Sequence, residues 1–171
     1  IDRQELGQNL IYATVDADVS DNTTVSVGAS RQHNKSKSTM WGGLPSYLSD
    51  GSKAEWDTSK NGSADWSNWD SDNVYYFADI DHDFNEDWNL TTNASYNESD
   101  SSPKLLYIYA NSNQVIDPDV GLVYNLNPFH ADTERKQVNV KTKLTGNFDA
   151  LGRKHQVIVG GSYKKSDLDT F

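Results

Sequence analysis

Apolar and polar residues alternate with a period of two along six segments of the chain, which is the pattern of strands with one apolar face. In the segment 138–148, for example, Val138, Val140 and Leu144 alternate with Asn139, Lys141 and Lys143. The six segments are 11–19, 23–29, 74–84, 88–96, 138–148 and 157–163. We therefore predict an all-β fold, in which about six long antiparallel strands form a meander of three hairpins without a helix.

The connections between these segments are of two kinds. Short turns of about three to six residues surround Asp21, Glu86 and Gly152, whereas long loops cover about 31–72 and 99–135. Outer-membrane β-barrels combine short periplasmic turns with long extracellular loops, whereas soluble sandwiches usually keep both ends short. The pattern favours a membrane barrel, with the apolar face toward lipid and the polar face toward the lumen.

The aromatic residues of the apolar face fall into two groups. Beside the short turns lie Phe84, Trp88 and Phe148, and about eight residues further along the strands lie Tyr76, Tyr96 and Tyr163. Eight tilted strand residues span on the order of 20 Å, which is close to the apolar band between two aromatic girdles. Because six strands are too few to close a barrel of known size, we expect the chain to be one sector of a larger barrel.

Composition excludes several classes of protein. The 171 residues carry 15 Lys and Arg against 25 Asp and Glu, a net charge of −10, which argues against binding to nucleic acid. The chain has no cysteine, which excludes thiol catalysis and cysteine-ligated metals. No stretch approaches the roughly 20 apolar residues that a membrane helix needs, which excludes helical membrane spans. No nucleophile motif, phosphate loop or defined pair of acids is visible, so we do not expect an enzyme.

Several short motifs, in a fixed order along the chain, resemble those of TonB-dependent ferric-siderophore receptors of the ferric-coprogen and ferric-pyoverdine type. The first long loop contains Trp-Gly-Gly-Leu-Pro at 41–45, Tyr-Leu-Ser-Asp-Gly at 47–51 and Ala-Asp-Trp-Ser-Asn-Trp-Asp at 64–70. The runs at 104–109, 152–155 and 159–163 fit the same family. The resemblance covers nearly the whole chain.

The resemblance implies a sector of a 22-stranded barrel in the bacterial outer membrane, with the long loops extracellular and the short turns periplasmic. Residues 1–171 then form part of a receptor that binds and imports ferric siderophores, with outer-membrane lipid and TonB as further partners. The plug domain, through which such receptors contact TonB, is absent from these 171 residues. No cofactor is expected, because iron arrives already chelated by the siderophore.

Aromatic residues of the two long loops are the candidate siderophore-binding residues, because their rings offer stacking surface and their NH and OH groups can bond hydroxamate or amide oxygens. The candidates are Trp41, Tyr47, Trp56, Trp66, Trp69, Tyr107 and Tyr109. If the strand that begins at Trp88 has no bulge, Tyr107 and Tyr109 face the lumen. The alternative for all seven residues is a purely structural role in packing the loops or filling the lumen.

Two other groups of residues give no metal site. The acidic run Asp79, Asp81 and Asp83 imitates the start of a calcium loop, but Phe84 and Leu90 stand where that loop needs glycine and glutamate. We interpret the run as an acidic lumen face that pairs with basic plug residues. The four histidines are scattered without metal-ligand spacing, so no metal ligands are predicted.

Two alternatives remain open at this point. A soluble β-sandwich that binds carbohydrate through the tryptophan-rich loop would bury Val138, Val140 and Leu144 against a second sheet. An autonomous small barrel would need at least two further strands, from the regions 114–127 or 1–8. Both alternatives are decided by what the apolar face contacts and by whether the sheet closes.

Overall fold

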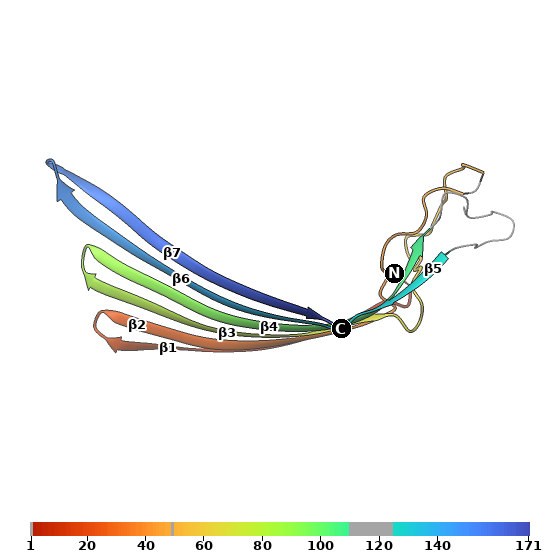
Figure 1. The fold of residues 1–171 in the computed structure, drawn as a ribbon, viewed down its shortest axis with the longest axis horizontal. Coiled ribbons are helices and arrows are strands. Elements are labelled where there is room, and N and C mark those ends of the chain that lie inside the picture. The colour runs from red at the N-terminus through yellow and green to blue at the C-terminus, as the bar shows by residue number, and fades with distance from the viewer. Residues whose placement is uncertain (1, 49, 110–124) are drawn as a thin grey trace.

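The computed structural model describes residues 2–48, 50–109 and 125–171, and their dominant feature is one antiparallel sheet of seven strands. The strands are β1 (Glu5–Ser20), β2 (Thr23–Lys37), β3 (Asn68–Asn85), β4 (Trp88–Tyr109), β5 (Asn125–His130), β6 (Thr133–Ala150) and β7 (Arg153–Thr170). Their order in the sheet is β1-β2-β3-β4-β6-β7, with β5 paired to β4 (Figure 1). The predicted all-β meander of three hairpins is confirmed.

The seventh strand, β5, was not predicted from the sequence. It pairs with the last part of β4, from Lys104 to Tyr109, in the same register that β6 keeps further along β4. The interruption between β5 and β6 lies opposite Pro103, which has no N–H to donate to a neighbouring strand. The backbone of Asp132 instead exchanges two hydrogen bonds with Phe171.

The three short turns are tighter than expected and all lie at one end of the sheet (Figure 1). Each contains two residues, at 21–22, 86–87 and 151–152. Leu151 and Gly152 both have positive φ, 52° and 70°, as a type I′ hairpin turn requires. The long loops are shorter than predicted as well. Parts of the ranges 31–72 and 99–135, which were predicted to be loops, belong to strands β2, β3, β4 and β6.

The strands project their apolar residues to one face in continuous rows. Residues that are direct cross-strand partners point to the same side of a sheet. One row crosses all six long strands and consists of Val15, Val27, Ala78, Ala94, Val140 and Tyr163. In the next row Tyr76 lies opposite Tyr96, with the rings stacked at 6.5 Å, so Tyr163 is one row nearer the short turns than these two tyrosines.

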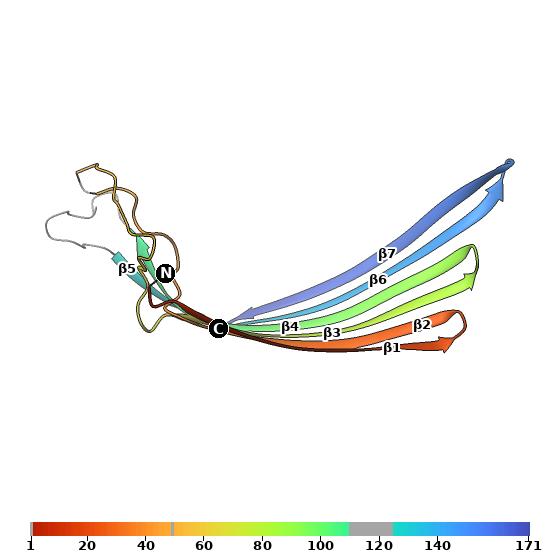
Figure 2. The same cartoon turned by 180° about the vertical axis from the view of Figure 1, so that it is seen from behind.

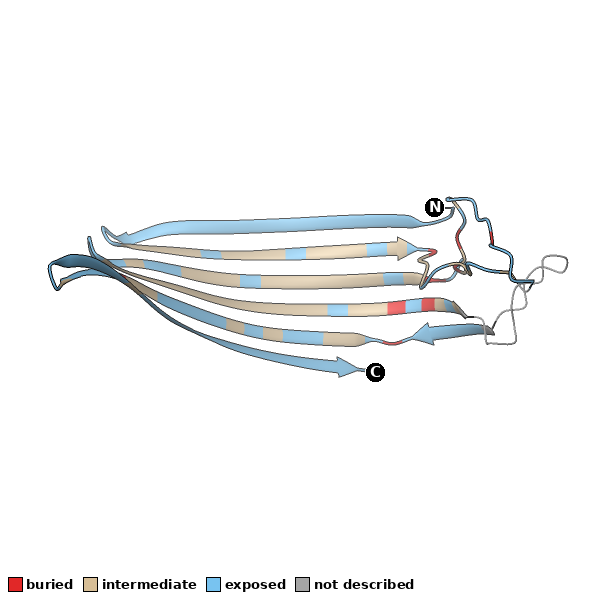
Figure 3. Ribbon diagram, turned by 90° about the horizontal axis from the view of Figure 1, so that it is seen from above, coloured by how far each residue is buried: buried red, intermediate tan, exposed pale blue. Residues whose placement is uncertain are grey.

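No second layer covers this apolar face among the described residues. Val138 and Val140 are 39% and 37% exposed, and the buried apolar residues, Ala54, Leu105 and Ala131, all lie at the loop end. Figure 3 shows the outer strands exposed along their length and the inner strands as a mixture of intermediate and exposed positions, with most of the buried residues at the loop end. The soluble-sandwich interpretation is therefore unsupported.

The sheet is open in the part of the chain that the structure describes. Strands β1 and β7 are its two edges, and each pairs along its length with one neighbour (Figure 2). Residues 5–8 belong to β1 and add no strand, whereas 114–124 lie outside the described residues. No helix within 2–48, 50–109 and 125–171 is long and apolar enough to cross a membrane.

Candidate functional site

The polar face of the sheet leads up to an aromatic cluster at the loop end. Strand β4 pairs with β3 and then β5 without a register shift from Asn89 to Tyr109. The odd-numbered residues of β4 therefore all lie on one face of the sheet. This is the polar face, because it includes Asn93, whose side-chain amide donates to Asp79 on β3 (2.6 Å). The prediction that Tyr107 shares the polar face is confirmed.

Three rings from three segments meet at this end of the polar face, and we call them the aromatic cluster: Trp41, Tyr107 and Phe129. The ring centroids of Trp41 and Tyr107 are 5.3 Å apart and tilted by 58°, and those of Trp41 and Phe129 are 4.9 Å apart and tilted by 48°. Trp41 and Tyr107 also form an isolated backbone bridge. Leu105, only 2% exposed, lies opposite Phe129 and is the largest fully buried side chain described.

The other predicted aromatic residues lie outside this cluster. Trp56 donates its Nε1–H to the carbonyl of Pro45 (2.6 Å), and Trp69 donates to Ser101 Oγ (2.8 Å). Tyr47 bridges to Lys53 and remains 62% exposed, and Trp66 is half exposed. The seven candidates were grouped from the sequence, but the fold divides them between one packed cluster, separate loop positions and the start of β3.

Tyr109 is the last residue of β4, and its side chain is not among the described parts of the structure. Phe129 was missed by the sequence analysis, because it falls in a segment that was assigned to a loop. The only sequence signal nearby is Leu126 between Asn125 and Asn127, an alternation that is too brief to identify a strand.

A buried polar clasp holds the loop 38–67, which carries Trp41. The side-chain amide of Asn61, 8% exposed, donates to the carbonyls of Ser38 (2.8 Å) and Asp2 (2.9 Å). Ser63 Oγ donates to the same Ser38 carbonyl (2.7 Å). Arg3 adds an ion pair with Asp65 and donates to the carbonyls of Asn61 and Ser63. These contacts fix the loop against the start of β1.

Two aspartates cap turns within the same loop. The hydroxyl and backbone N–H of Ser52 donate to Asp50 and lower the pKa of its carboxyl. The backbone N–H of Ser59 donates to Asp57 (2.8 Å) and likewise lowers the pKa of Asp57. The loop is therefore organised by its own hydrogen bonds as well as by its aromatic residues.

Nearer the short turns, the polar face is divided by charge. Acidic residues lie on β1 and β3, namely Asp16, Asp18, Asp79, Asp81 and Asp83. Lys141 and Lys143 lie on β6, separated from the acids by β4, whose Asn89 donates to both Asp81 (2.7 Å) and Asp83 (2.9 Å). Amides thus hold the carboxylates of β3 in place, and no ion pair within the described residues neutralises the five acids.

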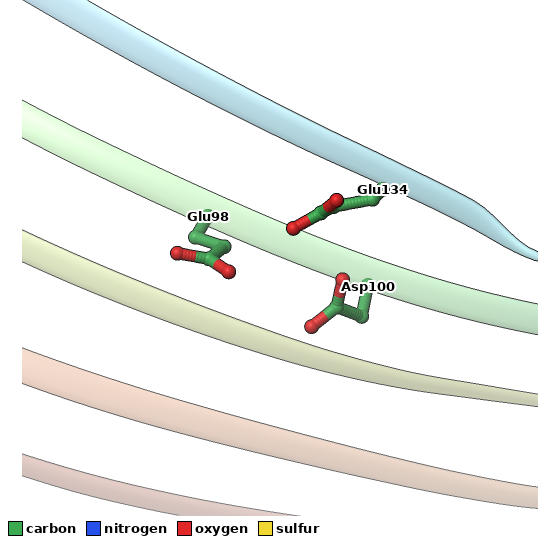
Figure 4. A group of neighbouring side chains, drawn as sticks. All are labelled: Glu98, Asp100 and Glu134. Carbon is green, nitrogen blue, oxygen red and sulfur yellow. The ribbon is translucent and has the colours of Figure 1, made fainter. Parts of the chain in front are cut away.

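Three further carboxylates gather on the opposite, apolar-row face beyond Tyr96. Glu98 and Asp100 on β4 and Glu134 on β6 bring ligand-type oxygens within 4.8 Å of one another (Figure 4). The Tyr96 hydroxyl donates to Glu98 (2.8 Å), and Lys136 pairs with Glu134. Two of the three carboxylates therefore have partners on the protein, and the group lies on the other face from the aromatic cluster.

The chain has the fold of a sector of a siderophore-receptor β-barrel: its open curved sheet and exposed apolar rows fit this class, and the comparison with solved structures shows it. No protein-family model matches the chain. It is homologous to ferric-pyoverdine receptors, among them the ferric-pyoverdine M114 receptor PbuA of Pseudomonas sp. strain M114. The two sequences are 28% identical over 162 residues, which is 95% of this chain and 19% of that receptor. The resemblance seen in the sequence is confirmed.

Solved structures agree with this assignment. FpvA of Pseudomonas aeruginosa, bound to a heterologous pyoverdine and iron, superposes with a TM-score of 0.88 at 26% identity over 99% of this chain and 22% of FpvA. The siderophore receptor PiuA of Acinetobacter baumannii has the same fold, with a TM-score of 0.79 at 20% identity over 98% of this chain and 24% of PiuA. The chain spans about a fifth of the length of the curated relatives it matches.

Proposed function

We propose that this chain is part of an outer-membrane receptor that binds ferric siderophores and imports them with energy supplied through TonB. The homology over 95% of the chain to ferric-pyoverdine receptors is the observation that carries this proposal. The relatives are receptors, which fits a role in transport and not in catalysis. Iron is cargo in this account, held by its chelator.

The exposed apolar rows support a position in the membrane. An apolar band that no second layer covers in the described chain is stable where it contacts hydrocarbon, and a lipid-facing band bounded by aromatic residues is typical of outer-membrane barrels. Trp88 near the short turns and the stacked pair Tyr76 and Tyr96 bound this band. The long loops are then extracellular and the two-residue turns periplasmic.

The aromatic cluster is the proposed contribution of this chain to siderophore binding. Trp41, Tyr107 and Phe129 offer ring faces and edges at the loop end of the polar, lumenal face, where a ligand that enters from outside arrives first. Tyr107 and Phe129 are 39% and 38% exposed, which leaves ring surface for a ligand to bury. Trp69, on the same face of β3, extends this surface.

A plug domain supplied by other parts of the full-length protein is the proposed occupant of the lumen. The divided lumenal charge supports it, because basic plug residues would face β1 and β3 and acidic ones would face β6. The lumenal aspartates of β1 and β3 and the lumenal lysines of β6 have no ion-pair partner in the described chain. A plug would bury these charges, and buried charges require such partners.

Uptake of radiolabelled iron tests the proposed function. The full-length protein is expressed in a strain that lacks its own siderophore receptors, with and without an intact tonB gene, and a panel of ferric siderophores that includes ferric pyoverdine is supplied. We expect uptake of at least one member of the panel, and only when TonB is present. Uptake that does not depend on TonB, or no binding of any ferric siderophore by the purified protein, contradicts the proposal.

A further inference from the structure

Gly42 lies against the Cδ2–Cε2 edge of the Tyr107 ring and directly follows Trp41, another member of the aromatic cluster. A Cβ atom at Gly42 would lie 2.7 Å from Cε2 and 3.1 Å from Cδ2 of Tyr107. Both distances are shorter than ordinary van der Waals contact. The ring of Tyr107 can therefore lie where it does only because residue 42 has no side chain.

The backbone of Gly42 imposes a second, independent requirement. Its φ is +89°, in the left-handed region that side chains rarely adopt. This conformation turns the chain immediately after Trp41, whose backbone bridges to Tyr107. The first residue of the Gly42-Gly43 pair thus permits both the turn and the close approach of loop and strand.

Two other glycines of this loop do not share both features of Gly42, the left-handed backbone and the close contact with a ring. A Cβ atom at Gly43 would have open space around it, with no atom beyond its chain neighbours within 4 Å, and Gly43 has no left-handed φ. Gly51 has a φ of +82°, close to that of Gly42, but likewise has open space where a Cβ would lie. Among the described glycines, only Gly42 combines a left-handed conformation with contact to an aromatic ring of the cluster.

We propose that Gly42 is a positioning residue for siderophore binding: it sets the spacing of the Trp41 and Tyr107 rings that the ligand contacts. This inference rests on the proposed function. A side chain at position 42 would push the Tyr107 ring or the loop away, which would widen the 5.3 Å separation of the ring centroids. A ligand that stacks on the cluster would then lose contact with one of the two rings.

A double-mutant cycle in the full-length protein tests this inference, with ferric pyoverdine as the probe. We expect Gly42→Ala to raise the Kd about tenfold or more, and Gly43→Ala and Gly51→Ala to raise it less than about twofold. In a Tyr107→Ala background, Gly42→Ala is expected to raise the Kd by less than about twofold, because the ring that it displaces is gone. The folded fraction of each variant is measured by heat-modifiable migration on gels.

Two results overturn the inference while the wild type still binds. One is an unchanged Kd in Gly42→Ala, and the other is an equal effect of Gly42→Ala with and without the Tyr107 ring, which would indicate a backbone role alone. If Gly42→Ala does not fold, recovery of folding in the double variant supports the clash, and no recovery contradicts it. If the wild type binds no ferric siderophore, the proposed function itself fails, and the inference fails with it.

Discussion

Trp41 and Tyr107 are 66 residues apart in the chain, yet their backbones form a bridge and their ring centroids lie 5.3 Å apart. The bridge joins the first long loop to the far end of β4, on the polar face of the sheet. Phe129 from β5 also packs against Trp41, with the ring centroids 4.9 Å apart. The loop end of the sheet is therefore a packed aromatic surface and not a set of independent loops.

Truncation of either ring tests the role of this surface in binding. In the full-length protein, Trp41→Ala or Tyr107→Ala is expected to raise the Kd for a bound ferric siderophore about tenfold or more, or ~1.4 kcal/mol, because each removes stacking area from the same surface. Titration of intrinsic or ligand fluorescence measures the Kd. Tyr76→Ala, on the lipid-facing side, is the control and should leave the Kd unchanged. Unchanged affinity in both cluster variants would remove these residues from the site.

The polar clasp makes a separate prediction about loop order. Asn61→Ala removes the donor to two backbone carbonyls in a buried site, which is expected to cost about 1–3 kcal/mol of local stability. Limited proteolysis should then cut within 38–67 faster than in the wild type. Asn147→Ala, at an exposed position far from this loop, is the matched control and should be cut as slowly as the wild type. Equal cleavage of all three proteins would show that the clasp does not hold the loop.

The alternation of faces predicts opposite effects for neighbouring substitutions on β6. Val140→Lys places a charge on the apolar row and is expected to cost about 2–4 kcal/mol in the membrane, whereas Asn139→Lys places it on the lumenal face at little cost. Folding into lipid vesicles, followed by heat-modifiable migration, measures the difference. Comparable folded yields for the two variants would be inconsistent with a lipid-facing Val140.

The sheet was predictable from the sequence because its information is local. Val138, Asn139 and Val140 show the period of two directly, and the polar turn at 85–87 marks where β3 ends. The turns proved shorter than expected because strand residues such as Asn85 and Trp88 pair right up to them. Apolar periodicity does not distinguish a tight turn from one that is a few residues longer.

The aromatic cluster and the clasp were only partly predictable because they depend on contacts between distant segments. Tyr107 could be assigned to the polar face by counting along β4, but the sequence holds no sign that Trp41 would contact it. Phe129 was hidden by Pro128 and by the brevity of β5. Arg3 donates to the carbonyl of Asn61, and the Asn61 side chain donates to the carbonyl of Asp2. Both bonds join residues nearly 60 positions apart, and no local sequence pattern predicts such a pair.

The central claim is that one face of this sheet contacts hydrocarbon while the other lines an aqueous lumen, and single cysteines along β6 test it most directly. These 171 residues contain no cysteine, so in a cysteine-free version of the full-length protein positions 138–143 can each be replaced in turn by cysteine and spin-labelled within outer-membrane vesicles. Collisions with oxygen, which concentrates in lipid, and with a water-soluble nickel chelate are then measured. We predict oxygen access at Val138, Val140 and Thr142, and access of the chelate at Asn139, Lys141 and Lys143. Access of the aqueous chelate to all six positions alike would contradict the account.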